Sequence, residues 1–283
     1  MPARTVTTER QRRLGSELRK MRMAAGITAD QAAGLLGVDR AKISNIETGI
    51  RTISPERLRT LACNCDCSDQ AYIGALVAMA RPVGRGWWER YRGALSPGLL
   101  DIAELESYAV RMRTAHTAHI PGLFQTSDHA LELFRAVLPP LPEHEVALRL
   151  AYRVERQQVL EGEHPPEYVG LVHEAALRMQ FGGRKVARAQ LLHLIHVSER
   201  PAVRVQVIPF SAGTFPGAGQ TVNYLHAPVP QLDTAQVDSS HGPEFLGDEA
   251  QLAKYRAHLD WMEGIALTPE ASRDFIHEIA NSL

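Results

Sequence analysis

Residues 27–38 carry the clearest structural signals in the first part of the chain, and they read Ile27-Thr28-Ala29-Asp30-Gln31-Ala32-Ala33-Gly34-Leu35-Leu36-Gly37-Val38. Thr28 stands where a helix N-cap belongs, and Gln31 follows three residues later. This spacing lets each side chain satisfy an unpaired amide at the start of a helix. Gly37 can then adopt the left-handed backbone conformation that commonly follows the end of a helix. The stretch predicts a short helix over residues 29–36, followed by a tight turn.

A second short helix is predicted directly after this turn. Asp39 can cap it, Ile43 and Ile46 give it an inner face, and Gly49 ends it. Its other face is polar. Two helices joined by a turn of three to four residues that contains Gly, with the second helix polar outside, are typical of a helix-turn-helix unit.

Three further helices are predicted around this pair. Residues 13–23 keep a near-helical apolar spacing and end at Gly26. Ser54 followed by Pro55 predicts a capped helix to about residue 64, because Pro fits the first helical position. Residues 69–80 are almost wholly apolar and predict a core helix. The first part of the chain is therefore predicted to hold five helices.

Residues 27–38 and 43–49 together resemble the Xre family of phage-repressor-like DNA-binding domains. The resemblance implies a five-helix domain over residues 13–80, with the helix near residue 40 in the major groove of DNA. It places Arg40, Ala41 and Asn45 at base-facing positions. An arginine can bind guanine through two hydrogen bonds, which discriminates between bases by roughly 1–3 kcal/mol. The alternative for the same segment is a helical module that docks a protein.

Phosphate contacts are expected around this helix, where they would set its register on DNA. The residues placed for them are Thr28 at the start of the preceding helix, with its free amides, and Lys42, Ser44 and Arg51. The chain departs from the family at Ala29, where Gln is common, so one phosphate anchor is in doubt. The family also pairs an Arg with a Glu at the positions of Arg22 and Glu47, and we interpret that pair as structural.

Charge divides the chain in two. Residues 1–90 hold 15 Lys or Arg against 9 Asp or Glu, a net charge of +6, and the remaining residues hold 16 against 23, a net charge of -7. A polyanion partner is thus expected for the first part only. Arg outnumbers Lys 27 to 4 throughout, so Arg abundance alone says little about binding.

Composition excludes several classes of protein. The chain has 283 residues, 45% hydrophobic and 22% charged, which is the profile of a globular protein and not of a disordered or collagen-like one. Its apolar runs are far shorter than the roughly 20 residues of a membrane span, and its N-terminus lacks the apolar segment of a secretion signal. We therefore expect a cytoplasmic protein without membrane contact. Three cysteines within residues 63–67 predict packing rather than a metal knuckle or a disulfide.

Pro82, Gly84 and Gly86 interrupt the helical pattern. We predict a DNA-binding domain at residues 1–81, a linker with an aromatic junction at 82–92, and a second domain at 93–283. In the second domain, the following segments are predicted as extended: residues 108–120, 167–172, 202–209, a strand ending near 225, and 231–237. Helices are predicted at residues 127–137, 143–161, 186–198, 248–264 and 268–280. Helices and strands without regular alternation indicate an α+β domain.

The second domain resembles the domain that follows the Xre unit in a large group of actinomycete regulators. The resemblance rests on residues 87–91 (WWERY), 121–126 (PGLFQT), 153–157 (RVERQ) and 174–178 (EAALR). It implies a domain that senses a small molecule or binds a small partner protein. The sequence thus predicts a mainly α, five-helix helix-turn-helix domain followed by an α+β sensing or partner-binding domain. The alternative is an antitoxin-like protein that sequesters a small partner and regulates its own promoter.

Candidate residues for this ligand or partner site come from those motifs: Trp87, Trp88, Tyr91, Phe124, Gln125, Arg153 and Arg156. The aromatic residues can line a pocket, or they can pack at a domain junction. The two arginines lie one helical turn apart and can bind an anion or, alternatively, form ion pairs with nearby Glu residues.

Enzymatic motifs are absent from the sequence. We find no G-x-S-x-G, G-x-x-x-x-G-K-[ST], G-x-G-x-x-G or H-E-x-x-H, and so expect no catalytic residues and no cofactor. His116 with His119 and His193 with His196 have spacings that metal ligands can use, but exposed or core histidines are commoner, and we predict no metal site. The overall expectation is a homodimeric regulator that reads a palindromic site on double-stranded DNA.

Overall fold

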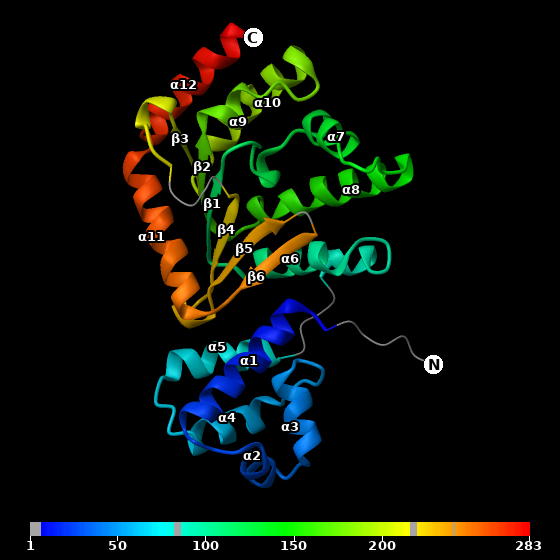
Figure 1. Ribbon diagram of the computed structural model, residues 1–283, viewed down its shortest axis with the longest axis vertical. Coiled ribbons are helices and arrows are strands. Elements are labelled where there is room, and N and C mark those ends of the chain that lie inside the picture. The colour runs from blue at the N-terminus through cyan, green and yellow to red at the C-terminus, as the bar shows by residue number, and fades with distance from the viewer. Residues whose placement is uncertain (1–6, 82–85, 216–219, 240) are drawn as a thin grey trace. The chain divides into compact units, whose positions relative to one another are not determined.

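The computed structural model describes residues 7–81, 86–215, 220–239 and 241–283, which form two compact units (Figure 1). The first unit is Met1–Leu105 with Pro228–Leu232, and the second is Glu106–Ala227 with Asp233–Leu283. Of the predicted linker, residues 82–85 lie outside the described residues, and Trp87–Tyr91 forms a 3-10 helix, η1. The division predicted at residues 81 and 93 stays a prediction.

The five predicted helices of the first unit are confirmed. They are α1 (Glu9–Ala24), α2 (Ala29–Leu36), α3 (Arg40–Glu47), α4 (Pro55–Asn64) and α5 (Gln70–Ala80). Helix α1 begins earlier than predicted, because Thr8 and Gln11 form a capping box of the kind found at Thr28 and Gln31. A sixth helix, α6 (Pro97–Tyr108), was not predicted; it begins in the first unit and ends in the second.

The turn between α2 and α3 has the geometry that its sequence predicts. Gly37 caps α2 in the left-handed region, at φ 60°, where a side chain would be strained. The Asp39 carboxylate then accepts the Lys42 backbone N–H at 2.7 Å and caps α3. Ile43 and Ile46, 3% and 5% exposed, anchor α3 to the core of the unit. The opposite face of α3 is left outside this core.

A buried ion pair and one glycine fix α3 against α1. Arg22 binds both carboxylate oxygens of Glu47, at 2.6 and 2.9 Å, and donates a further hydrogen bond to the Ile27 carbonyl at 2.6 Å. Gly15 lies where the helices meet, and a Cβ there would be 2.5 Å from the Ile46 carbonyl oxygen. The structural interpretation of the Arg22–Glu47 pair is confirmed.

The second unit contains a six-stranded mixed sheet in the order β3-β2-β1-β4-β5-β6. Strands β1, β2 and β3 run parallel, whereas β4, β5 and β6 pair antiparallel to their neighbours. The bounds are β1 (Arg111–His116), β2 (Glu167–His173), β3 (Val203–Ile208), β4 (Val222–His226), β5 (Thr234–Ser239) and β6 (Gly242–Leu246). Strand β6 was not predicted. The extended segment predicted at residues 108–120 is too long, because α6 continues through Tyr108 and β1 ends at His116.

Helices accompany this sheet, so the predicted α+β class is confirmed. They are α7 (Ser127–Arg135), α8 (Glu143–Arg156), α9 (Glu174–Arg178), α10 (Gly183–Ser198), α11 (Glu249–Ile265) and α12 (Pro269–Ser282). Short 3-10 turns also occur: η2 (Gly122–Phe124), η3 (Gln157–Leu160), η4 (Phe210–Ala212) and, within the first unit, η6 (Pro230–Leu232).

One face of the sheet is apolar and packs on α11. Alternate residues on the strands, including Ala115, Leu171, Tyr224 and Ala235, join Leu259 of α11 in one buried cluster. This alternation follows from the pleat of a strand, which sends successive side chains to opposite faces.

The opposite face of the sheet carries polar side chains on three neighbouring strands. His116 Nε2 lies 3.4 Å from the Asn223 side-chain oxygen, Asn223 donates to Gln236 at 2.5 Å, and Gln236 donates to Asp238 at 2.7 Å. Phe124 of η2 also lies on this face: its ring packs edge to face on that of Tyr168, with 4.6 Å between centroids. A hydrogen-bonded polar row therefore crosses β1, β4 and β5.

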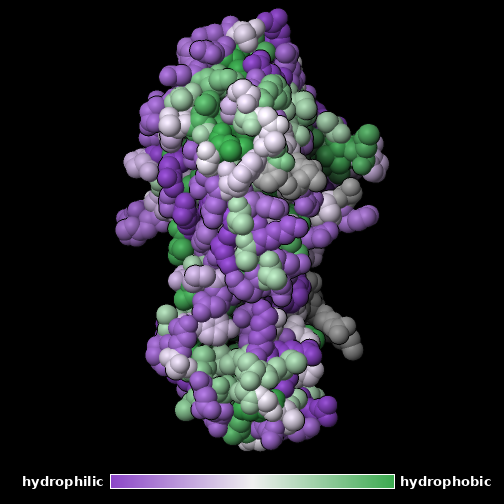
Figure 2. Space-filling model, turned by 60° about the vertical axis from the view of Figure 1, so that its left-hand side comes forward, coloured by the Kyte–Doolittle hydropathy of each residue, from purple (hydrophilic) through white to green (hydrophobic). Residues whose placement is uncertain are grey.

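Hydrophilic side chains cover much of the surface visible in Figure 2, and hydrophobic residues lie among them in patches. In the part of the chain that the structure describes, every helix is too short or too polar to cross a lipid bilayer.

Candidate functional site

Helix α3 presents a polar face at its N-terminal end. Arg40 is the first residue of the helix, and its side chain is 72% exposed. Ala41 and Ser44 are also exposed, and Asn45 is half-buried. Arg40 lies 3.4 Å from the Asp30 carboxylate, which is itself 67% exposed. An ion pair this exposed contributes about 0–1 kcal/mol, so it can exchange for another partner at little cost.

The residues predicted to contact phosphates surround this face. Lys42 is half-buried within α3, and Arg51 is exposed just after it, with its backbone N–H bonded to the Asn45 carbonyl at 3.0 Å. Thr28 caps α2, where its hydroxyl accepts the Gln31 N–H at 3.2 Å. Cationic and hydroxyl groups therefore flank the exposed side of α3, as a phosphate-contacting surface requires. Their roles on DNA stay predictions.

The three aromatic candidates at residues 87–91 pack on one another. The Trp87 ring meets Trp88 and Tyr91 edge to face, with centroids 5.9 and 6.1 Å apart. Trp88 and Tyr91 are each 8% exposed.

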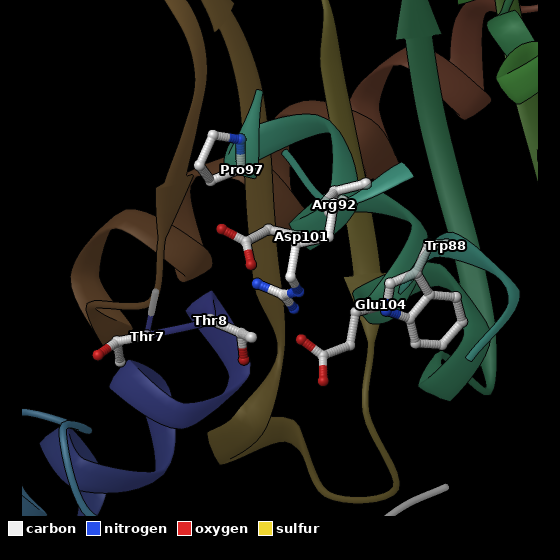
Figure 3. A pocket seen from close by; sticks show the side chains of 8 residues that line it. Thr7, Thr8, Trp88, Arg92, Pro97, Asp101 and Glu104 are labelled. Carbon is white, nitrogen blue, oxygen red and sulfur yellow. The ribbon is translucent and has the colours of Figure 1, made fainter. Parts of the chain in front are cut away.

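Trp88 also lines a small pocket in the first unit, together with Thr8, Arg92, Asp101 and Glu104 (Figure 3). The Arg92 guanidinium lies between the two carboxylates in this view, and burial raises the pKa of both Asp101 and Glu104. The cavity volume is about 10 Å³, which is room for one water molecule. A small organic ligand does not fit this pocket.

The two candidate arginines of α8 have different partners. Arg156 binds both oxygens of Glu106 at 2.6 Å, in a pair whose side chains are only 11% and 5% exposed, and this raises the arginine's pKa. The ion-pair alternative therefore describes Arg156. Arg153, by contrast, donates from Nη1 to the Gln125 amide oxygen at 2.5 Å and lies over the Phe134 ring. Among the described residues, no carboxylate lies within ion-pair distance of Arg153.

The other two candidates from the second domain are buried. Gln125, 4% exposed, donates to the Ile120 carbonyl at 2.7 Å and so holds its oxygen toward Arg153. Phe124 is fully buried against Tyr168. The structure thus brings Gln125 and Arg153 together, with Phe124 as part of the packing beside them.

The two histidines of each candidate pair differ in how far they are buried. His116 is 7% exposed at the end of β1, whereas His119 is exposed. His193 is half-buried, and His196 lies 3.6 Å from Glu199 on the surface of α10. In the described ranges, no three His, Cys, Asp or Glu side chains are grouped so that they could hold a metal ion. The cysteines are free, with Cys65 buried as packing predicts.

His129 was missed by sequence reasoning. It lies on α7, is 2% exposed, and neither ring nitrogen has a hydrogen-bond partner. Burial lowers the pKa of His129 to about 4, and that of His116 likewise to about 4. Both imidazoles are therefore neutral at pH 7. No local motif marks His129, because its neighbours come from distant parts of the chain.

A larger hollow lies elsewhere in the second unit, between the segments that lead into β2 and β3. Its volume is about 690 Å³, and Glu161, His164 and Arg200 line it. Arg200 pairs with Glu161 across 3.2 Å. No residue predicted for the site lines this hollow.

Two family models match the chain. One, described as a helix-turn-helix domain, matches residues 13–71. The other, described as a domain of unknown function (DUF5753), matches residues 99–278, which is more than half of the chain. No curated protein and no solved structure matches it. The first match supports DNA binding as the activity of the α1–α5 region, because helix-turn-helix domains insert their second helix into the major groove.

Proposed function

Because this chain belongs to the DUF5753 family and carries a helix-turn-helix domain ahead of that region, we propose that it is a sequence-specific transcriptional regulator of the Xre type. The observation that carries the proposal is the exposed N-terminal face of α3, where Arg40 is held by nothing stronger than a surface ion pair. In this role Arg40 binds a guanine and Asn45 an adenine or a neighbouring side chain.

The regulator acts as a homodimer on a palindromic operator in this proposal. Two copies of α3 then enter successive major grooves, about 34–36 Å apart. The test is selection of bound duplexes from a random pool by the full chain, with the oligomeric state measured alongside by analytical ultracentrifugation. A selected motif with two inverted half-sites supports the proposal. Recovery of unrelated sequences by a chain that binds DNA without preference would contradict it.

Lys42 provides the first mutational test of the proposal. Lys42→Ala removes a cation assigned to a phosphate, so we expect weaker binding to every DNA sequence, and a salt dependence (log Kd against log salt) shallower by about one. Fluorescence anisotropy over a salt series measures both quantities. Lys20→Ala is the matched control, because Lys20 lies on α1 and is bound to Glu17 at 2.8 Å. An unchanged salt slope in Lys42→Ala would show that Lys42 does not contact a DNA phosphate.

The second unit senses a small molecule or a small partner protein in this proposal and catalyses no reaction. Helix α6 begins in the first unit and ends in the second. Its Asp101 carboxylate accepts the Glu9 N–H at the start of α1, at 2.9 Å, and its Glu106 binds Arg156. An effector that weakens DNA binding must itself bind less tightly to the DNA-bound form, since coupling is reciprocal.

The antitoxin-like role stays the alternative prediction for the second unit. It requires a small protein that co-purifies in stoichiometric amount and is toxic alone. Turnover of a substrate by the full chain would instead overturn the non-catalytic proposal.

A further inference from the structure

Three histidines and an arginine of the second unit form a group that we call the imidazole–arginine cluster: His116, His119, His129 and Arg153. They come from the end of β1, from the loop after this strand, and from α7 and α8, which lie on one side of the sheet in Figure 1. The His119 and His129 rings share a neighbour, Phe181, at centroid distances of 5.3 and 5.5 Å. Arg153 lies over the ring of Phe134, at 5.0 Å from the centroid, and Phe134 belongs to α7, the helix that carries His129. Burial, together with the charge of Arg153, lowers the pKa of all three imidazoles.

The unpaired ring nitrogens of His129 are the first observation that points to a ligand of this cluster. The residue is 2% exposed, and both ring nitrogens are buried without a hydrogen bond. Leaving such a group unsatisfied costs about 1–3 kcal/mol, so proteins rarely retain one without a use for it. A neutral imidazole can donate one hydrogen bond and accept another.

The charge of Arg153 is the second observation that points to a ligand. Burial lowers the pKa of Arg153 to about 10, which still leaves it charged at pH 7. Two carboxylates act on it from beyond ion-pair distance: Glu106, which Arg156 binds through both oxygens, and Asp238, which accepts the Gln236 amide at 2.7 Å. Gln125 supplies one neutral acceptor. The positive charge therefore has no close counter-charge among the described residues.

The position of the cluster also suits a ligand. His116 ends β1, one of three parallel strands, and ligands commonly bind outside the carboxyl ends of such strands. His116 also ends the polar row that runs through Asn223 to Asp238. A bare metal ion is the wrong occupant, because Arg153 repels cations. A group with negative oxygens matches both the guanidinium and the imidazole N–H donors.

We propose that the imidazole–arginine cluster binds the oxyanion group, carboxylate or phosphate, of a small acidic molecule. Arg153 supplies the charge, and His129 donates a hydrogen bond to the same group. The proposal rests on the sensing role of the second unit and gives that role a ligand class.

Direct binding to the full chain tests the proposal. Thermal-shift and calorimetric titrations use succinate, inorganic phosphate and inorganic sulfate, each at constant ionic strength against sodium chloride. We expect saturable binding of at least one oxyanion below about 20 mM, a weak affinity suited to a fragment of the full ligand. Succinate against phosphate distinguishes the carboxylate source from the phosphate source. Absence of saturable binding by all three probes would overturn the proposal.

Variants separate a binding arginine from a structural one. Arg153→Met should weaken oxyanion binding at least tenfold, with at most a small loss in the ligand-free Tm, because it removes a charge without a close counter-charge but also removes the donor to the Gln125 side-chain oxygen. His129→Phe keeps the ring packing on Phe181 and should also weaken binding without lowering the Tm. Arg135→Met on α7 is the control, because Arg135 is exposed and pairs with Glu132 and Glu143; it should bind normally.

A lower ligand-free Tm in both Arg153→Met and His129→Phe, with oxyanion binding intact in either, would show that these side chains serve packing and would overturn the proposal. Binding is measured without DNA. Failure of the oxyanion site therefore leaves the DNA-binding proposal standing, and failure of operator selection leaves oxyanion binding measurable.

Discussion

Replacing Arg22 by Ala is expected to destabilise the α1–α5 region by about 3–5 kcal/mol. The substitution leaves the Glu47 carboxylate in a site where its side chain is only 9% exposed, with both hydrogen bonds to the guanidinium lost. It also removes the donor to the Ile27 carbonyl, just before α2. Denaturant unfolding followed by far-UV circular dichroism measures the change. Because stability totals only about 5–15 kcal/mol in most proteins, DNA binding should weaken at physiological temperature as well.

The control for this prediction is the double variant Arg22→Met with Glu47→Leu. It replaces the pair by apolar side chains of similar volume, so no buried charge is left alone, and most of the lost stability should return. A loss below about 1 kcal/mol in Arg22→Ala would mean that the pair is solvated and does not hold α3.

Glu106→Ala should destabilise the second unit by a similar amount, about 3–5 kcal/mol. Arg156 loses both of its 2.6 Å hydrogen bonds and keeps a charge that is 11% exposed. The pair joins the end of α6 to the end of α8, two helices far apart in sequence. Trp261 on α11 is the tryptophan of this unit, so its fluorescence during denaturant unfolding, in a background that carries Trp87→Phe and Trp88→Phe, measures the loss.

Glu145→Ala is the matched control for Glu106→Ala. Glu145 pairs with Arg149 across 3.9 Å, with side chains 42% and 32% exposed, and an exposed pair at this spacing contributes less than about 1 kcal/mol. Equal losses in the two variants would contradict the argument that burial makes the Glu106–Arg156 pair important.

The helix-turn-helix pair could be predicted closely from sequence because its signals are local. Thr28, Asp39 and Ser54 each accept a backbone N–H three residues ahead, and Gly37 ends α2 where the sequence predicts. The capping box at Thr8 has the same spacing, so the true start of α1 was also readable but was missed. Capping depends only on residues within one turn, and no tertiary contact is needed to recognise it.

Features of the second unit that depend on contacts distant in sequence could not be predicted from the sequence. Strand β6 is a sheet edge of intermediate exposure, so it shows no alternation between buried and exposed residues. The sequence could not choose between an ion pair and a ligand for the two arginines of α8. Only the fold decides, because it brings Glu106 to Arg156 and leaves Arg153 with Gln125. His129 carries no local signal, since its role depends on Phe181 and Arg153.

Selection of bound duplexes by Arg40→Ala tests whether the N-terminal face of α3 reads bases. Arg40 is 72% exposed, so its removal should leave folding intact. We expect the variant to lose preference at one guanine of each half-site, by roughly 1–3 kcal/mol, and to keep the rest of the wild-type motif. A motif identical to the wild type at every position, with equal affinity, would show that Arg40 does not read a base.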